Sequence, residues 1–129
     1  MGMYTGIRFK AKLNEHGKGI VQKLLDAGSW EGLHEFSKIW RSRFIPFGVL
    51  SCMPDSWDKS REDADRTPLS ERRVWTVCCS LKNYENEIEY FLEKVLPGLI
   101  AEITVVEYLY EEWKNSKFIE VSPGQGSLP

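Results

Sequence analysis

The stretch that decides the fold is YTGIRFKAKL, residues 4–13. From Thr5 to Leu13, every second residue is apolar or small enough to face a core. The residues between them are mostly cationic, and we call Arg8, Lys10 and Lys12 the basic row. A period of two with one apolar side is typical of a strand that covers a core with one face. We therefore predict a half-buried strand whose other face carries the basic row.

The rest of the chain alternates between helical and extended patterns. Apolar residues at a spacing of three or four predict helices, whereas β-branched and aromatic runs predict strands. Asn83 suits a helix start, because its side chain can accept a bond from an amide of the first turn. The predicted elements are helices at about 20–28, 29–41 and 83–97, and strands at 47–53, 74–81, 100–113 and 117–121.

This order of elements predicts an α+β domain of the ferredoxin-like type, β-α-β-β-α-β. Right-handed crossovers place both helical layers on one face of an antiparallel sheet, so the other face is expected to be open. The first strand is then expected between the strands at 74–81 and 100–113. With 129 residues, the chain is near the commonest size of one domain, which we predict over residues 1–121.

Two segments show no sustained apolar period. Residues 54–73 contain six acidic residues, five basic residues and two prolines, and we predict a long surface loop there between the second and third strands. Loops of this length inside a compact domain are often functional. Residues 122–129 are polar and rich in Gly and Pro, so we expect a disordered C-terminal tail.

The composition excludes several classes of protein. A net charge of −2 argues against a general nucleic-acid binder, which usually carries a basic excess. No run of 18 apolar residues exists, so we predict no membrane span. Three cysteines in a chain of this size fit a reducing compartment, and we predict a cytoplasmic protein.

The adjacent cysteines of the 74–81 strand raise the question of redox, metal or nucleophile chemistry. Neighbouring side chains of a strand point to opposite faces, so Cys78 and Cys79 cannot jointly bind one ion. We expect Cys79 in the core and Cys78 partly exposed on the other face. The sequence has no C-x-x-C, H-x-x-x-H or H-E-x-x-H pattern. We therefore predict no metal site, no cofactor and no catalytic cysteine.

The open sheet face is the first candidate binding surface, and its character depends on the phase of 100–113. If Glu107 and Glu111 face outward, they pair with the basic row across the strands. If Tyr108 and Tyr110 face outward, rings beside cations resemble a platform on which RNA bases stack. Both phases are about equally apolar, so the sequence leaves this choice open.

Exposed aromatic and arginine residues are a second candidate, because Trp and Arg are enriched at binding hot spots. They come from the 54–73 loop and from the end of the second predicted helix. The predicted partner-binding residues are Trp40, Arg41, Arg43, Trp57, Arg61 and Arg66. In the alternative interpretation, Trp40 belongs to the core and Trp57 anchors its own loop.

A third candidate is an acidic stripe on the 83–97 helix. Glu85, Glu89 and Glu93 follow one another at a spacing of four residues and fall on one face of a helix. Like charges at this spacing repel each other, so the stripe can serve to dock a basic partner. The alternative is an ordinary solvated helix face.

These observations favour a domain that binds rather than catalyses. Our leading hypothesis is a small cytoplasmic protein-binding or self-associating domain with an accessory or inhibitory role and no cofactor, as a phage or another mobile element would encode. The alternative is a nucleic-acid-binding module that uses the open sheet face. The third is a small-molecule enzyme or ligand-binding domain with His16 or His34 as acid or base. It ranks last because no acid–base pair or nucleophile arrangement emerges.

Overall fold

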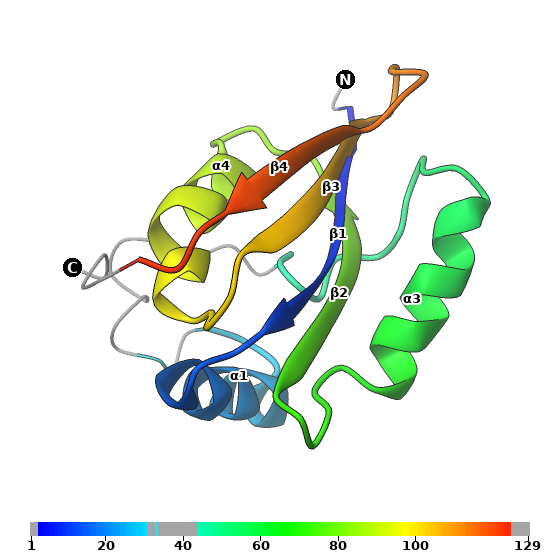
Figure 1. The fold of residues 1–129 in the computed structure, drawn as a ribbon. Helices are drawn as coiled ribbons and strands as arrows, with labels where there is room; N and C mark the ends of the chain where they lie inside the picture. The colour runs from blue at the N-terminus through cyan, green and yellow to red at the C-terminus, as the bar shows by residue number, and fades with distance from the viewer. Residues whose placement is uncertain (1–2, 31–32, 34–43, 125–129) are drawn as a thin grey trace.

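The computed structural model describes residues 3–30, 33 and 44–124 (Figure 1). Most of the second predicted helix and residues 125–129 of the predicted tail lie outside the described residues. Four candidate residues of the sequence analysis also lie outside them: His34, Trp40, Arg41 and Arg43.

The fold is α+β, and its centre is a four-stranded sheet in the order β2-β1-β3-β4. The strands are β1 (Thr5–Lys12), β2 (Val74–Leu81), β3 (Thr104–Tyr110) and β4 (Lys117–Val121). All neighbouring strands are antiparallel. As predicted, β1 lies between the 74–81 strand and the strand that follows residue 100. The prediction of a short strand at 117–121 is confirmed as well.

The sheet separates two helical layers. Helices α1 (Glu15–Ala27) and α4 (Glu87–Tyr90) lie on one face, which we call the inner face, and α3 (Ser56–Arg66) lies on the outer face (Figure 1). A π-helical turn at Phe91–Val95 and a 3-10 turn at Leu96–Gly98 continue α4. Helices α1 and α4 share one face, as predicted, but the other face, which was expected to be open, is partly covered by α3, in a segment that was predicted as a loop.

The ferredoxin-like order of elements is not confirmed. The segment 47–53, predicted as a strand, forms none, and Cys52 adopts a left-handed backbone conformation with φ 61°. Hydrogen bonds to a side chain hold this segment beside β2: the N–H of Ser51 donates to Ser80 Oγ (2.7 Å), which lies 2.9 Å from the carbonyl oxygen of Val49. With no strand there, β2 is the edge of the sheet, and it pairs antiparallel with β1 as predicted.

The main core lies on the inner face, where the alternation of β1 predicts it. Ile7, Phe9 and Ala11 are buried there. The ring of Phe9 packs edge-on against Trp75 at 5.6 Å between ring centroids and lies 6.1 Å from Phe91. Large rings bury much apolar area, so this aromatic cluster joins β1, β2 and the helical layer below them.

Helix α1 begins and ends at residues that the sequence makes suitable. The side chain of Asn14 accepts a bond from the N–H of Gly17 (2.6 Å), and the N–H of Gly28, with φ 73°, donates to Leu24 (2.8 Å). A Cβ on Gly17 would lie 2.1 Å from the carbonyl oxygen of Leu99. Glycine is thus required where α1 meets the segment before β3, and the predicted stop near Gly28 is confirmed.

The helix predicted at 83–97 is shorter than expected at its start. The N-cap of α4 is Asn86, which has a left-handed backbone, and α4 begins only at Glu87. Asn83 accepts a bond from the N–H of Ile88 (2.9 Å), five residues on, and not from the amide two or three residues on that was predicted. Tyr84, expected on the apolar side of this helix, therefore lies before it and is 69% exposed.

Candidate functional site

The pairing of β1 with β3 decides the phase that the sequence left open. Arg8 lies opposite Glu107, and Ile7 lies opposite Tyr108. Opposite residues of an antiparallel pair share a face, so Glu107 is on the outer face with the basic row. Tyr108 and Tyr110 are on the inner face. The structure therefore separates the tyrosines from the cations with which an RNA platform would group them.

Arg8 and Glu107 form the centre of the outer face. The Nε and Nη2 atoms of Arg8 donate to the two carboxylate oxygens of Glu107 at 2.7 and 3.1 Å. Ser116 Oγ donates to the same carboxylate (2.6 Å). Burial raises the pKa of Glu107, but the hydrogen bonds from Arg8 and Ser116 outweigh it, so that the pKa lies below its usual value. The first cation of the basic row is thus neutralised within the protein.

Helix α3 covers the part of the outer face that was expected to be open. Trp57 and Ala64 of this helix pack with Cys78 of β2 and Leu109 of β3 in a second, smaller core. The segment predicted as a long surface loop is thus an amphipathic helix in its middle. Its apolar side is narrow, which explains why the charged sequence around it conceals the helical period.

Trp57 does not present its ring to solvent. It is 1% exposed, and the guanidinium carbon of Arg8 lies 4.3 Å from its ring centroid. A Cβ on Gly6 would come within 2.9 Å of the ring, so the strand below must carry glycine. This is the arrangement expected of the alternative interpretation, in which Trp57 anchors its own segment.

The other two candidate residues of this helix differ from each other. Arg61 Nη1 donates to the carbonyl oxygens of Gly48 and of Cys78 (3.1 Å), and its Nε donates to Asp65 (3.1 Å). It therefore ties the 44–50 segment to the edge of β2. Arg66, at the end of α3, is exposed and accessible to a partner.

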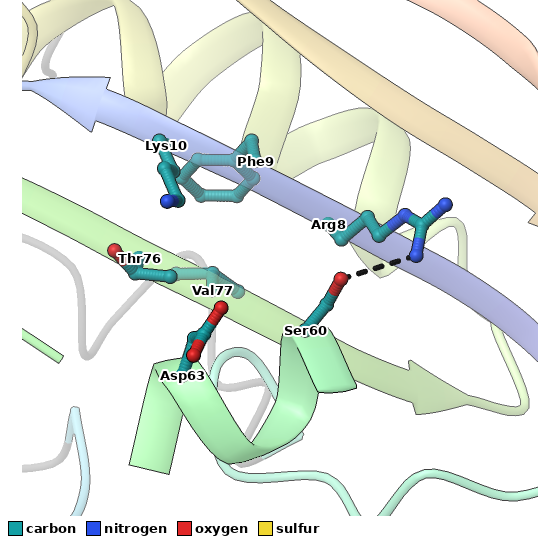
Figure 2. Close-up of a pocket in the computed structure, with 7 residues that line it drawn as sticks. All are labelled: Arg8, Phe9, Lys10, Ser60, Asp63, Thr76 and Val77. Atoms are coloured by element: carbon teal, nitrogen blue, oxygen red, sulfur yellow. Dashed lines mark hydrogen bonds between the residues drawn. The ribbon is translucent and has the colours of Figure 1, made fainter. Parts of the chain in front are cut away.

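A small groove runs between α3 and the first two strands (Figure 2). Its volume is about 220 Å³. Ser60 and Asp63 extend from α3 toward Lys10 and the sheet, and Ser60 bonds to Arg8 (3.1 Å) in Figure 2. The lining residues are Arg8, Phe9, Lys10, Ser60, Asp63, Thr76 and Val77. The groove is polar and carries both signs of charge, so it favours neither an anion nor a cation.

The rest of the basic row is also partly engaged. Lys12 Nζ donates to the carbonyl oxygen of Arg72 (2.5 Å), whereas Lys10 is exposed at the groove. A surface that attracts phosphates needs several available cations in a row. The basic row offers one such lysine, Lys10, between two engaged cations.

Both cysteines of β2 are buried. Cys79 faces the inner core, as predicted, and is 0% exposed. The expectation that Cys78 is partly exposed is wrong: α3 covers it, and it is 2% exposed with its sulfur 3.7 Å from the carbonyl oxygen of Trp57. Burial raises the pKa of Cys78 to about 11 and that of Cys79 to about 12. Their thiolates, the nucleophilic forms, are disfavoured near neutral pH.

Two kinds of site remain to be considered among the described residues: a metal site and an acid–base site at a histidine. Within the described residues, no three side chains of His, Cys, Asp or Glu gather in a way that could hold a metal ion. His16 is exposed in the first turn of α1. It does not line any of the hollows described here.

The acidic stripe is not a continuous helix face. Glu85 precedes α4, and Glu93 is exposed in the π-helical turn. Glu89 between them accepts bonds from Asn83 Nδ2 (2.7 Å) and from the hydroxyl of Tyr108 (2.9 Å). One member of the stripe thus holds the helix against the sheet instead of facing a partner.

The tyrosines line a shallow hollow of about 340 Å³ at the inner end of the sheet. Trp113 lies 5.8 Å from the ring centroid of Tyr108 and 6.0 Å from that of Tyr110. The hollow is lined by Met3, Thr5, Lys82, Asn83, Tyr84, Tyr108 and Tyr110. Sequence reasoning found two of these residues, but it placed Tyr84 inside a helix and missed Lys82.

An apolar surface that the sequence analysis missed lies on β3 and β4. Val105 is 50% exposed and Phe118 is 65% exposed. Glu107 lies opposite Phe118, and Val105 lies opposite Glu120, so both apolar side chains are on the outer face. Ile103, just before β3, is 61% exposed. We call Ile103, Val105 and Phe118 the β3–β4 patch.

The patch is exposed because α3 is packed over β2, at the other edge of the sheet (Figure 1). The alternation of 117–121 indicates the face on which Phe118 lies, but it does not show that this face is uncovered. That alternation places Phe118 and Glu120 on one side of the strand and Ile119 on the other.

Comparison with protein-family models, with curated proteins and with solved structures finds no match for this chain. None of the helices in the described residues is long and apolar enough to cross a membrane.

Proposed function

We propose that this chain is a protein-binding domain that acts as an accessory or inhibitory component without a cofactor and binds its partner through the β3–β4 patch. The observation that carries this proposal is the exposure of Val105 and Phe118 at diagonal positions of two neighbouring strands on the outer face. Exposed apolar side chains that gather on one surface mark interaction sites, whereas single ones are ordinary.

The position of the patch supports the same function. It lies at β4, the last strand in the sheet order, and next to the partly buried pair of Arg8 and Glu107. Interfaces commonly combine an apolar centre with a polar rim that fixes the orientation of the partner. Phe118 provides the large ring at this centre, and the charged pair provides one side of the rim.

Protein binding fits these residues better than nucleic-acid binding does. Arg8 and Lys12 already have partners inside the protein, and the tyrosines lie on the other face. Residues 102–120 contain five glutamates and two lysines, a balance that repels phosphates. We also propose a cytoplasmic location, which is supported by the three free cysteines.

Site-specific photo-crosslinking in cells that produce the protein tests this proposal. Benzoylphenylalanine replaces Phe118 in one variant and Tyr84 in the other. Tyr84 is a matched control because it is similarly exposed, at 69%, but lies before α4 and outside the β3–β4 patch. We expect a discrete protein adduct from position 118 and none of the same mass from position 84. The proposal is wrong if position 118 gives no adduct or if both positions give the same one.

A further inference from the structure

We infer that the partner of the β3–β4 patch is an extended strand of another protein that pairs with the free edge of β4 and places a basic residue beside Glu120. This inference rests on the proposed function and specifies the kind of partner. Addition of a strand to a sheet edge is a common mode of recognition, in which backbone bonds give affinity and alternate side chains give specificity.

The two edges of the sheet differ in whether their outward backbone groups are already hydrogen-bonded, and at β2 several of them are. The N–H of Thr76 donates to the carbonyl oxygen of Pro68 (2.9 Å), and the N–H of Ser70 donates to that of Val74 (3.0 Å). Arg61 then occupies the carbonyl oxygen of Cys78 (3.1 Å). Proline has no N–H to offer, so this covering segment does not create a new edge at Pro68. Devices of this kind prevent a further strand from pairing.

The other edge has no such cover in the described part of the chain. β4 pairs with β3 over all five of its residues, from Lys117 opposite Tyr108 to Val121 opposite Thr104. Figure 1 shows β4 as the outermost strand. After it, the chain turns toward the helical layer, where the N–H of Gly124 donates to Pro97 (2.9 Å). Alternate backbone groups of β4 therefore point away from the sheet and are available for pairing.

The charges around this edge indicate a basic partner. Glu120 is exposed on the outer face of β4, and Glu102 and Glu112 are exposed just before and just after β3, whereas the exposed Lys117 of β4 lies opposite Tyr108 on the inner face. Glu107 is already neutralised by Arg8. An acidic rim around an apolar centre favours a partner with the opposite charge and repels one with the same charge.

A second copy of this chain fits the edge less well than such a partner. In a symmetric antiparallel pair of β4 strands, outer-face residues lie opposite outer-face residues only when the two-fold axis passes through a residue. Three such registers pair at least three residues of each strand. The register centred on Ile119 places Phe118 of one copy opposite Glu120 of the other. The register centred on Glu120 places the two Glu120 carboxylates opposite each other, where they repel. The register centred on Phe118 pairs the two rings but leaves Glu120 opposite Ser116 without a cation. A strand from another protein can match every position.

The same pairing rule gives the sequence of a test peptide. An antiparallel strand Thr-Lys-Val-Ile-Glu-Thr places Lys opposite Glu120, Ile opposite Phe118 and Glu opposite Lys117. The control peptide Thr-Glu-Val-Ile-Lys-Thr has the same composition and exchanges the two charges. Each peptide, with blocked ends, is titrated into the ¹⁵N-labelled full chain, and amide shifts report where and how tightly it binds.

We expect shifts centred on 116–121 and an affinity about fivefold higher for the first peptide, because two cross-strand pairs change from attraction to repulsion in the control. Glu120→Lys should remove or reverse this preference. Glu62→Lys makes the same change of charge at an exposed position of α3, over the opposite edge of the sheet, and should preserve it. Both variants change surface positions and should fold.

Three results would overturn the inference: equal affinity for both peptides, shifts centred elsewhere, or a dimer in sedimentation experiments that Phe118→Ser dissociates. If the peptides fail in this way while position 118 still gives its crosslinked adduct, the protein-binding function stands and the strand partner is wrong. If neither experiment succeeds, both proposals are wrong.

Discussion

Arg8 and Glu107 face each other across β1 and β3 and are joined by two hydrogen bonds of 2.7 and 3.1 Å. Their side chains are 24% and 18% exposed. Fork-like pairing of a guanidinium with a carboxylate fixes the geometry of both groups. The pair lies between the surface that α3 covers and the β3–β4 patch, and its hydrogen bonds join β1 to β3 at this position.

The first prediction concerns this pair and pH. Glu107→Gln should lower the free energy of unfolding by about 1 kcal/mol at pH 7, because the charged acceptor of Arg8 and Ser116 is lost. The pKa of Glu107 is lowered in the folded state, so its contribution is complete above the usual value of 4.5 and disappears as the pH falls through the lower, folded-state value. The difference between wild type and variant should therefore shrink in acid.

Urea unfolding at pH 7 and pH 3 measures this difference directly. Glu112→Gln is the control: it makes the same chemical change at an exposed residue that is not paired with Arg8. A gap between wild type and Glu107→Gln that stays constant from pH 7 to pH 3 would contradict the assignment of the ion pair.

The second prediction concerns the indole below Arg8. Trp57→Ala should lower the free energy of unfolding by about 3–5 kcal/mol, because it removes a fully buried ring from the small core between α3 and the sheet. Arg66→Ala, an exposed change on the same helix, should alter stability by less than about 0.5 kcal/mol. Thermal unfolding of the two variants compares them; equal stabilities would mean that α3 is not anchored by Trp57.

Much of the inner half of the fold was predictable because its signals are local. The alternation of 4–13 gave β1 and its buried face. Gly28 ends α1 as predicted, with a left-handed backbone, whereas α1 begins at Glu15, about five residues before the start that the apolar spacing predicts. The alternation and the terminal glycine need no knowledge of distant residues, which explains why they hold.

The outer half was not predictable because its signals depend on distant partners. α3 buries only Trp57 and Ala64, too few apolar residues to produce a helical period in a charged stretch. The run at 47–53 is apolar enough for a strand, but Ser80 binds its backbone as an irregular segment. The exposure of Phe118 follows from where α3 packs, and no residue near Phe118 encodes that position.

The phase of β3 illustrates the same limit at the candidate site. Glu107 and Tyr108 are neighbours, and either could face outward by composition. The choice is made by pairing with β1, where Arg8 meets Glu107 and Ile7 meets Tyr108. A shift of one residue would move every side chain of the strand to the other face.

The third prediction concerns the three free cysteines and tests the cover over the outer face. Cys52 is exposed, whereas Cys78 and Cys79 are buried on opposite faces of β2. Native protein should therefore give one thiol that reacts with Ellman's reagent, and protein unfolded in guanidinium should give three. Cys52→Ser should abolish the native reaction and leave two thiols on unfolding.

Cys78 is the informative residue here, because without α3 it would lie on an open sheet face. Its pKa, raised to about 11 by burial, further slows the reaction near pH 8. Trp57→Ala loosens α3 and should expose Cys78 to the reagent before global unfolding, while Cys79 in the inner core stays protected. If Cys78 in the wild type reacts as fast as Cys52, α3 does not cover the sheet as described.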